Sequence, residues 1–432
     1  MVLQILFGVL VFVMALGIPI AWCLGIAGLA GLMAMGSVPL SIVPQKMFSG
    51  MDIFPMLCLP FFILAGEFMG HGSIGDRLLR FAMVCVGRVR GGLSLANVLN
   101  SMFFGGITGS ATADASSVGA IEYKLMVKSG YDAPFSAAIT AASSCMGPII
   151  PPSLPVVIYA VAVSGVSIGG LFAAGLIPGI LIGLALMVAC YVISIRRGYP
   201  KREEPVTFKE FVSVTWEASL ALILPVIIFG GIVFGIFTPT EAAAVAAVYS
   251  FIVSCFIYRD VKLSELPGIF YRAGVISAVV MMIIATANIF GVVIAYERVA
   301  SMLQSLVEPL GYYGFLFTVN IIFLIVGMFM DQNPAILILA PVFAPIAVNL
   351  GIHPLHFGMM LIVNLVIGLL TPPLGQILFV VCSYSGVKFE DMVREVSVFI
   401  MVDILCLFLI AYIPFFTTFV PALLGYIRSK RN

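Results

Sequence analysis

Long apolar stretches dominate this sequence and determine which solvent the folded chain can tolerate. Residues 3–35, for example, contain no Asp, Glu, Lys or Arg. A helix needs about 20 mainly apolar residues to cross a bilayer. Charged residues make up only 9% of the chain, against about 25% in soluble domains, so they cannot cover its surface in water. We therefore predict an all-α polytopic membrane protein whose exterior faces the lipid bilayer.

The apolar stretches also predict where individual helices lie. We expect residues 3–35 to form one long helix with a kink at Pro19. Residues 78–86 are too short to span the bilayer and lie among four arginines between positions 77 and 90, which predicts an interfacial arm helix. The other predicted spans are residues 53–69, 134–163, 169–195, 216–237, 242–258, 269–295, 357–382 and 396–424.

Several classes of function are disfavoured by the composition and the motifs. The net charge is +1, so no basic surplus points to nucleic acid. The eight cysteines lie singly in apolar runs, and the three histidines are too scattered for a metal cluster. The sequence carries no nucleophile elbow, HExxH, P-loop or dinucleotide-binding glycine pattern. We expect no enzymatic activity and no organic cofactor, and an ion gradient in place of ATP as the energy source.

Basic residues predict the orientation of the chain. The longest polar interruption, residues 196–210, is rich in Lys and Arg, and short loops of this kind stay in the cytoplasm. The N-terminal stretch lacks a basic start and a small-residue cleavage site, so we expect it to remain as a membrane helix. The basic residues are Arg196, Arg197, Lys201, Arg202 and Lys209 in the loop, and Arg428, Lys430 and Arg431 near a C-terminus that we also expect in the cytoplasm.

Two regions do not fit the pattern of spanning helices. In residues 93–127, short apolar runs flank the segment GGITGSATADASS at 105–117. In residues 315–348, they flank MDQNP at 330–334. Short apolar runs favour re-entrant segments, and irregular backbone at membrane depth is tolerated only inside protein or beside water. We predict two helical hairpins that enter the membrane and turn back.

An internal repeat relates these two regions at a constant offset of 221 residues. Gly147 corresponds to Gly368, and Ser110 corresponds to Asp331. The pair at 151–152, Pro-Pro, corresponds to the pair at 372–373, and no gap is needed over about sixty positions. Matched glycines and prolines determine where helices break, so they carry more weight than matched apolar residues. The identities alone leave open whether the two halves are parallel or inverted. Repeats with paired broken helices are typical of transporters whose sites lie at the repeat interface.

The broken helices carry the first candidate ion sites. SSCMGPIIPPS at 143–153 and NLVIGLLTPPLG at 364–375 combine prolines with hydroxyl or amide side chains. Unwound carbonyls together with Ser, Thr or Asn oxygens suit Na⁺. Ser143 and Asn364 are repeat equivalents, and Thr371 precedes the second proline pair. The alternative is a proline kink that is packed only for its shape.

The hairpin tips supply the other candidate residues. Thr108, Gly109 and Ser110 lie at the first tip, and Gln332 and Asn333 at the second. Beside them, Asp331 is expected to face sodium, to cap the helix that follows, or to lie at a watery tip. The same question applies to Asp114, Glu67 and Glu241, the last of which lies in the favourable first turn of its helix.

Taken together, these motifs resemble one transporter family along essentially the whole chain. The resemblance rests on GIPIAWCLGIAG (17–28), LPFFILAGEFM (59–69), FFGGITGSATADASSVG (103–119), GYDAPFSAAITAASSCMGPIIPPS (130–153), FTPTEAAAVAA (237–247) and GLLTPPLG (368–375). The chain resembles the large permease subunit of tripartite ATP-independent periplasmic (TRAP) transporters of the C4-dicarboxylate type. The resemblance implies two inverted repeats, an elevator motion of a transport domain against a scaffold, sodium coupling, and the inner membrane of a bacterium.

The resemblance also implies domains, sites and partners. The expected partners are a separate small four-helix membrane subunit and a periplasmic binding protein that delivers a small carboxylate, such as a C4-dicarboxylate, sialic acid or a sugar acid. The implied divisions are 1–92 (scaffold and arm), 93–165 (transport), 166–312 (scaffold and arm), 313–387 (transport) and 388–432 (scaffold). The implied substrate residues are Thr108, Gly109, Ser110, Ser144, Gln332 and Asn333, and the implied sodium residues are Ser110, Ser143, Gly147, Pro148, Pro151, Asp331, Asn364, Gly368 and Thr371.

Three other functions remain as alternatives at this point. The first is a stand-alone sodium-coupled anion transporter of a related elevator fold, which would need no binding protein. The second is a channel, which would conduct without sodium coupling. The third is a membrane-embedded enzyme, which no visible acid–base pair or metal set supports.

Overall fold

A computed structural model describes residues 1–201 and 206–427, apart from the side chains of Leu306 and Glu308. Arg202 of the basic loop and the basic residues Arg428, Lys430 and Arg431 lie outside the described residues. Every regular element in the described part is a helix. Seven of these helices are long and apolar enough to cross a membrane, or eight if one bent pair counts as a span. The predicted all-helical, multi-span architecture is confirmed.

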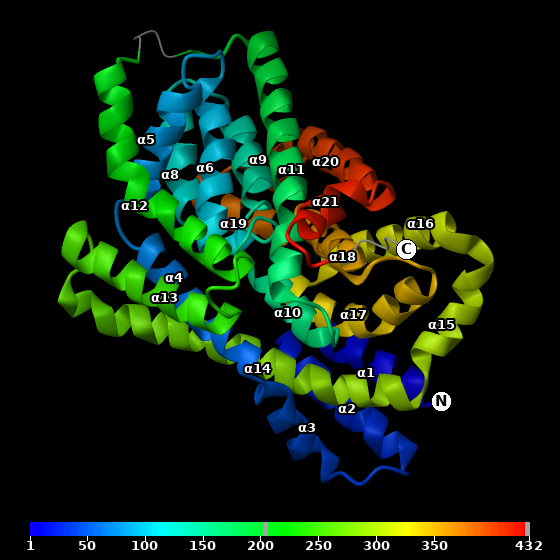
Figure 1. Cartoon of the computed structure of the whole chain (residues 1–432). Coiled ribbons are helices and arrows are strands. Elements are labelled where there is room, and N and C mark those ends of the chain that lie inside the picture. Colours follow the sequence, from blue (N-terminus) through cyan, green and yellow to red (C-terminus); the bar gives the residue numbers. More distant parts are fainter. Residues whose placement is uncertain (202–205, 428–432) are drawn as a thin grey trace.

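The first half of the chain contains α1 to α11, and the second half contains α12 to α21 (Figure 1). The first half is α1 (Val2–Ala15), α2 (Ile20–Met35), α3 (Ile42–Met51), α4 (Cys58–Gly70), α5 (Ile74–Val86), α6 (Gly92–Thr108), α7 (Ala111–Ser116), α8 (Val118–Lys128), α9 (Ala133–Ser144), α10 (Leu154–Ala162) and α11 (Ile168–Arg197). The second half is α12 (Phe208–Val233), α13 (Pro239–Ile252), α14 (Leu266–Tyr296), α15 (Val299–Val307), α16 (Gly311–Phe329), α17 (Gln332–Asn349), α18 (Pro354–Gly368), α19 (Gln376–Ser385), α20 (Phe389–Tyr412) and α21 (Phe415–Leu423).

The repeat seen in the sequence extends to the order of the helices. Helices α9 and α18 begin 221 residues apart, at Ala133 and Pro354, and α11 and α20 also begin 221 residues apart, at Ile168 and Phe389. Prolines occupy the first or second position of α9, α10 and α18, where the missing N–H would have no partner in any case. The amphipathic helices α5 and α15 each lead into a hairpin. The predicted arm at 78–86 is thus part of α5. Helix α15 is a second amphipathic arm helix, which the sequence analysis did not identify.

Three of the predicted spans differ in the structure. Residues 3–35 form two helices, because the chain turns at Gly17, whose φ is +75°, before Pro19. The side chain of Leu6 lies beside Gly31, so α1 and α2 run antiparallel. Residues 396–424 likewise divide at Pro414 into α20 and α21. The span at 53–69 is preceded by α3, which was not predicted and which meets the following helix at 62°.

The second hairpin also differs from the prediction in length. Its arms, α16 and α17, contain 19 and 18 residues, so each is long enough to cross a membrane. The argument from short apolar runs therefore does not hold for this hairpin. The polar tip remains where it was predicted, because Met330 and Asp331 are the two residues between the helices.

The core of the molecule is formed by reciprocal packing between the two halves. Helix α10 packs on α17, and its counterpart α19 packs on α7 and α8. Helices α11 and α20 pack against these central elements. Helices α2, α4, α13 and α14 pack mainly on one another, although α4 also contacts α6 and α14 also contacts α17. Figure 1 shows α13 and α14 running across one end of the bundle formed by α6, α8, α9 and α11.

A polar cluster ties three of the central helices together at one end. Arg197, the last residue of α11, contacts Glu395 of α20 at 2.8 Å and Asp132, the residue before α9, at 3.3 Å. Tyr199 donates a hydrogen bond to Asp132 at 2.6 Å. Burial raises the pKa of Tyr199 to about 12, so the phenol keeps its proton and remains a donor.

Candidate functional site

Both predicted helix breaks are present. Helix α9 ends at Ser144 and α10 begins at Leu154, while α18 ends at Gly368 and α19 begins at Gln376. The peptide bonds Pro151–Pro152 and Pro372–Pro373 are both cis. Prolines cannot donate a backbone hydrogen bond, so the connecting segments cannot continue the helical pattern.

The two broken helices meet at equivalent residues. The Cys145 thiol lies 3.8 Å from the carbonyl oxygen of Val366, and these positions are 221 residues apart. Farther along, the Tyr159 hydroxyl donates to the carbonyl of Pro354 at 3.3 Å. Residues that follow the first break therefore lie beside residues that precede the second, so the two broken helices run antiparallel. Contacts between equivalent residues are the property of a two-fold axis.

The break in the first repeat is joined to hairpin helix α6 by buried hydroxyl and amide groups. The Ser143 hydroxyl donates to Asn97 Oδ1 at 2.7 Å, and Ser101 donates to Ser143 at 3.1 Å. Ser144 donates to the carbonyl of Thr140 at 2.7 Å. Around the break, Ser153 donates to the carbonyl of Pro148.

Close backbone contacts complete this part of the site. Gly147 packs on the backbone of Ser110, because a Cβ built on Gly147 would lie 3.3 Å from the Ser110 carbonyl. A Cβ built on Gly106 would lie 3.1 Å from the carbonyl oxygen of Pro151. The five residues predicted for the first sodium region, Ser110, Ser143, Gly147, Pro148 and Pro151, therefore belong to the broken helix or to the adjoining hairpin tip.

The break in the second repeat has a similar arrangement. Asn364 donates to Asn320 Oδ1 of hairpin helix α16 at 2.5 Å, and both side chains are completely buried. A Cβ on Gly368 would lie 2.6 Å from Cα of Gly327 in α16. Thr371 donates to the carbonyl of Ile367 at 2.8 Å. Each broken helix therefore contacts its own hairpin through a polar side chain and through a glycine.

The hairpin tips are the N-termini of helices. Ser110 caps α7, with its hydroxyl accepting from the amide of Ala113 at 3.4 Å. Its equivalent, Asp331, caps α17 and accepts from the amide of Asn333 at 2.9 Å. The capping role considered for Asp331 is thus present. Glu241 is likewise part of the capping box of α13, in which it accepts from the Thr238 amide at 2.8 Å.

Several buried oxygen atoms near both breaks accept no hydrogen bond from the residues that the structure describes. In the first repeat these are Glu122 Oε2 and Asn100 Oδ1, while the buried carboxylate of Asp114 lies close to the hydroxyls of Ser101 and Ser144 without a hydrogen bond of good geometry. In the second they are the side-chain amide oxygens of Gln332, Asn333 and Asn364. Leaving a buried acceptor unpaired costs about 1–3 kcal/mol, so such clusters need a physical explanation. A cation with oxygen ligands would satisfy these atoms in both repeats.

A cavity of about 560 Å³ lies beside the first tip. Thr108, Ser110 and Thr112 line one side of it. On the other side, Arg272 of α14 pairs with Glu67 of α4 at 3.1 Å and contacts the His71 ring at 2.8 Å. The cavity therefore joins two of the predicted substrate residues to a guanidinium group. Four of the predicted substrate residues do not line it: Gly109, Gln332, Asn333 and the completely buried Ser144.

Some of these residues were not identified from the sequence. Asn97 and Asn100 of α6, Glu122 of α8 and Asn320 of α16 are all buried polar side chains. Each is a polar residue in a mainly apolar segment. Polar residues inside membrane segments are energetically costly and usually functional, so their presence was a signal that the sequence analysis could have used. Arg272 carried the same signal, because it is a charged residue inside the predicted span 269–295, but its partners Glu67 and His71 are about 200 positions away in the sequence and could not be inferred.

Comparisons with known proteins agree with this architecture. The family model for "Tripartite ATP-independent periplasmic transporter, DctM component" matches residues 7–416. The C4-dicarboxylate TRAP transporter large permease protein DctM of Pseudomonas aeruginosa is 41% identical over 404 residues, which cover 93% of this chain and 94% of that protein. The isethionate TRAP transporter permease protein DctMQ of Oleidesulfovibrio alaskensis is 40% identical over 414 residues, covering 95% of this chain but 65% of that longer protein.

A solved structure shares the fold at low sequence identity. The Alcanivorax borkumensis YdaH transporter, whose crystal structure is described as having an unusual topology, superposes with a TM-score of 0.61. The match covers 92% of this chain and 89% of the YdaH chain, at 12% identity. At that identity the likeness concerns the fold alone.

Proposed function

The chain belongs to the DctM component family of tripartite ATP-independent periplasmic transporters, and on that premise we propose that it couples sodium entry to the uptake of a small carboxylate. It is a large permease subunit, a multi-pass protein of the bacterial inner membrane, and not an enzyme. Sodium is a co-substrate in this proposal, and its gradient supplies the driving force.

The observation that carries the sodium proposal is the unwound backbone at both helix breaks, with hydroxyl, amide or carboxylate side chains beside it. Na⁺ prefers several hard oxygen ligands and no soft ones, as found at unwound helices of other transporters. The first region comprises Ser110, Ser143 and the backbone from Gly147 to Pro151. The second comprises Asp331, Asn364 and the backbone from Gly368 to Thr371. Their equivalence in the repeat supports one ion in each region.

The substrate proposal rests on the cavity beside the first tip. Its Arg272 guanidinium suits a bidentate carboxylate, and Glu67 holds the guanidinium in place by an ion pair. The relatives are named for C4-dicarboxylates and for isethionate, a sulfonate, at almost equal identity. These names support a small organic anion, for which we take a carboxylate as the first candidate. Thr108 and Ser110 of the first hairpin would contact the substrate in this cavity, whereas Gln332 and Asn333 of the second hairpin would reach it only after a motion that brings the two tips together.

We further propose that the two halves are inverted in the membrane and that transport is an elevator motion. The antiparallel broken helices support inversion, because a two-fold axis across them lies in the membrane plane. The basic residues agree, since α5 is followed by Arg88 and Arg90, whereas the segment from 297 to 308 around α15 contains one basic residue, Arg298. The moving unit would contain both hairpins and both broken helices, as the divisions 93–165 and 313–387 imply. Helices α11 and α20, which those divisions assign to the scaffold, pack on these elements, so in this proposal they move with them.

The partners follow from the tripartite family. We propose that a small membrane subunit braces α2, α4, α13 and α14, and that a periplasmic binding protein delivers the substrate. The longer relative DctMQ supports the first partner, because the region it has beyond the match provides room for a fused subunit. The alternative is a stand-alone sodium-coupled transporter, and substrate uptake in the complete absence of a binding protein would favour it.

The test is uptake into proteoliposomes that contain the chain and its small subunit, with binding protein added outside. Radiolabelled succinate, sialic acid and isethionate are offered with and without an inward sodium gradient. We expect uptake of one anion that needs both sodium and the binding protein. Ser143→Ala and Asn364→Ala should raise the sodium concentration for half-maximal uptake, because each removes a candidate oxygen ligand.

Two matched variants control for nonspecific damage. Ser277→Ala removes a hydroxyl that bonds only its own helix, and Asn349→Ala removes an exposed amide near the end of α17. Both should leave the sodium dependence unchanged. If Ser143→Ala and Asn364→Ala also kept the wild-type sodium dependence, the proposed ion sites would be wrong.

A further inference from the structure

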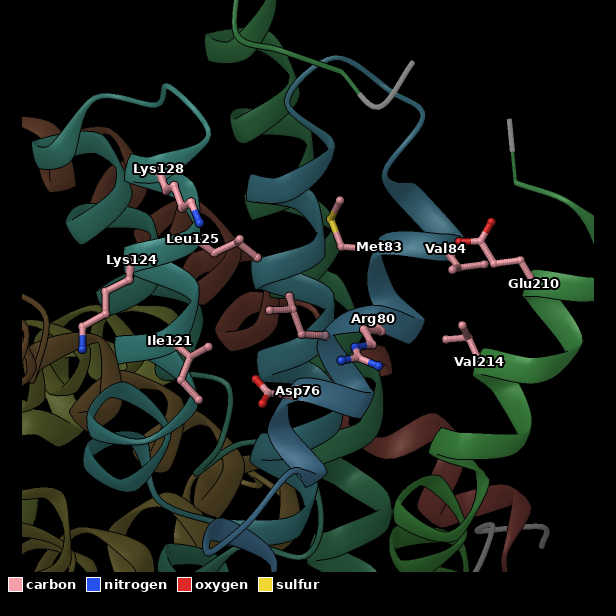
Figure 2. A pocket seen from close by; sticks show the side chains of 11 residues that line it. Asp76, Arg80, Met83, Val84, Ile121, Lys124, Leu125, Lys128, Glu210 and Val214 are labelled. Carbon is pink, nitrogen blue, oxygen red and sulfur yellow. The ribbon is translucent and has the colours of Figure 1, made fainter. Parts of the chain in front are cut away.

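A second, larger crevice lies away from the proposed transport sites. It has a volume of about 690 Å³ and lies between α5, α8 and the first turns of α12 (Figure 2). Figure 2 shows Arg80 of α5 between residues of α8 and residues of α12. The lining residues are Asp76, Leu79, Arg80, Met83, Val84, Ile121, Lys124, Leu125, Lys128, Glu210 and Val214.

The lining of the crevice combines charged and apolar side chains. Three of its side chains are basic (Arg80, Lys124 and Lys128) and two are acidic, so the lining carries a net charge of +1. The other six lining residues are apolar. Among these, Ile121 is 42% exposed and Leu125 is 38% exposed. A ligand that combines one negative charge with apolar chains would match both parts of this surface.

The position of the crevice favours the cytoplasmic edge of the bilayer. Glu210 and Val214 belong to the start of α12, directly after the basic loop at 196–207 that the positive-inside rule places in the cytoplasm. Lys128 is the last residue of α8. Helix α5 is amphipathic and is followed by Arg88 and Arg90, as expected for a helix at the membrane surface.

We propose that this crevice binds the headgroup of an anionic phospholipid from the cytoplasmic leaflet. Arg80, Lys124 and Lys128 would hold the phosphate, and the acyl chains would lie along Ile121, Leu125 and Val214. Basic pockets between membrane helices on the cytoplasmic side are suited to anionic lipid headgroups. A protein helix fits less well, because the cores of protein interfaces are depleted in charged side chains, whereas five of the eleven lining residues here are charged.

Such a lipid would connect the first hairpin to the two helices beside it, α5 and α12. Helix α8 belongs to the first hairpin, whereas α5 is the amphipathic helix that leads into this hairpin and α12 lies outside it. A bound headgroup would therefore contact the hairpin, the arm helix and the neighbouring helix at once. This binding site does not depend on the identity of the transported anion or on sodium.

Cys85 allows the site to be tested in place. It is the exposed cysteine among the eight and follows the lining residue Val84 on α5. The full chain with its small subunit is labelled at Cys85 with a fluorophore and placed in nanodiscs. Brominated phosphatidylglycerol or brominated phosphatidylcholine then serves as the quencher. We expect stronger quenching by phosphatidylglycerol at the same mole fraction.

Charge variants identify the residues responsible. Each basic residue near an anionic lipid contributes roughly a fivefold preference, so the triple variant Arg80→Gln, Lys124→Gln and Lys128→Gln should lose the selectivity for phosphatidylglycerol. The matched variant Lys262→Gln, Lys388→Gln and Arg394→Gln removes three charges elsewhere and should retain it. If the triple variant does not fold, Arg80→Gln and Lys128→Gln singly should each reduce the selectivity by about fivefold.

Three results would overturn the proposal. The first is equal quenching by both lipids in the wild-type complex. The second is undiminished selectivity in the triple variant or, if that variant does not fold, in both single variants. The third is protection of the Cys85 label from every lipid quencher by the small subunit, because a protein would then occupy the crevice.

Discussion

Two equivalent glycines show how single residues shape the candidate sites. Gly147 lies three residues after the end of α9, and Gly368 is the last residue of α18. Both glycines pack backbone against backbone on a hairpin. A Cβ built on Gly368 would lie 2.6 Å from Cα of Gly327, a distance that real Cβ atoms do not adopt. The absence of a side chain therefore brings the main-chain oxygens of the broken helix next to the hairpin.

Replacing one of these glycines should separate the two backbones. We expect Gly368→Ala to destabilise the protein by about 1–3 kcal/mol, the usual range for overpacking, and to abolish sodium-driven uptake. Thermal unfolding in detergent and uptake in proteoliposomes measure the two effects. Gly274→Ala is the control, because a Cβ at Gly274 in α14 meets nothing within 4 Å. Normal uptake by Gly368→Ala would show that this close contact is not required.

The caps of α7 and α17 link the hairpin tips to the stability of whole helices. Ser110 and Asp331 occupy the same position in the repeat and perform the same local task, which is to accept a backbone amide at the start of a helix. Capping satisfies one donor that the helix cannot pair internally. The caps therefore hold both hairpin tips in place without a bound ligand.

Two substitutions separate capping from ion binding at Asp331. Asp331→Asn keeps a good cap, so we expect unchanged thermal stability and a higher sodium requirement, because the negative charge is lost. Asp331→Ala should in addition lose about 1 kcal/mol of stability. Thr238→Ala, at the cap of α13, should cost similar stability without altering the sodium dependence. An unchanged sodium requirement in Asp331→Asn would limit this residue to capping.

Across the whole molecule, the elevator proposal divides the helices into two units that meet beside the first cavity. Helix α4 packs with α13 and α14, while the tip at Thr108 belongs to the hairpin bundle. A Cβ built on Gly66 of α4 would lie 3.9 Å from Cβ of Thr108, within the range for disulfides. This contact connects the two units that the elevator proposal moves past each other.

A reversible crosslink at this contact tests the motion. The oxidised double variant Gly66→Cys with Thr108→Cys should lose uptake, and a reductant should restore it to the level of the unoxidised variant. Gly25→Cys with Thr286→Cys has a similar spacing of 3.6 Å but joins α2 to α14 within one unit, so it should transport in both states. Full uptake by the oxidised Gly66–Thr108 pair would contradict the elevator proposal.

The sequence was sufficient for the features that depend on local chemistry. Apolar runs determine that lipid is the solvent, because each helix must place about 20 residues in the bilayer. Pro148 and the proline pairs at 151–152 and 372–373 lie within the breaks that follow α9 and α18, where they prevent the helix from continuing because proline lacks the backbone donor. The positions of the breaks and tips, and the family itself, were therefore predictable.

Contacts between distant segments were decided only by the tertiary structure. Nothing local indicates that α1 turns back on α2, that Asn320 pairs with Asn364, or that Arg272 pairs with Glu67 beside the first tip. Such pairs join residues 44 and 205 positions apart, and their geometry depends on how whole helices pack. Local residue chemistry specifies where a helix ends, whereas only packing specifies which buried oxygen atoms come together.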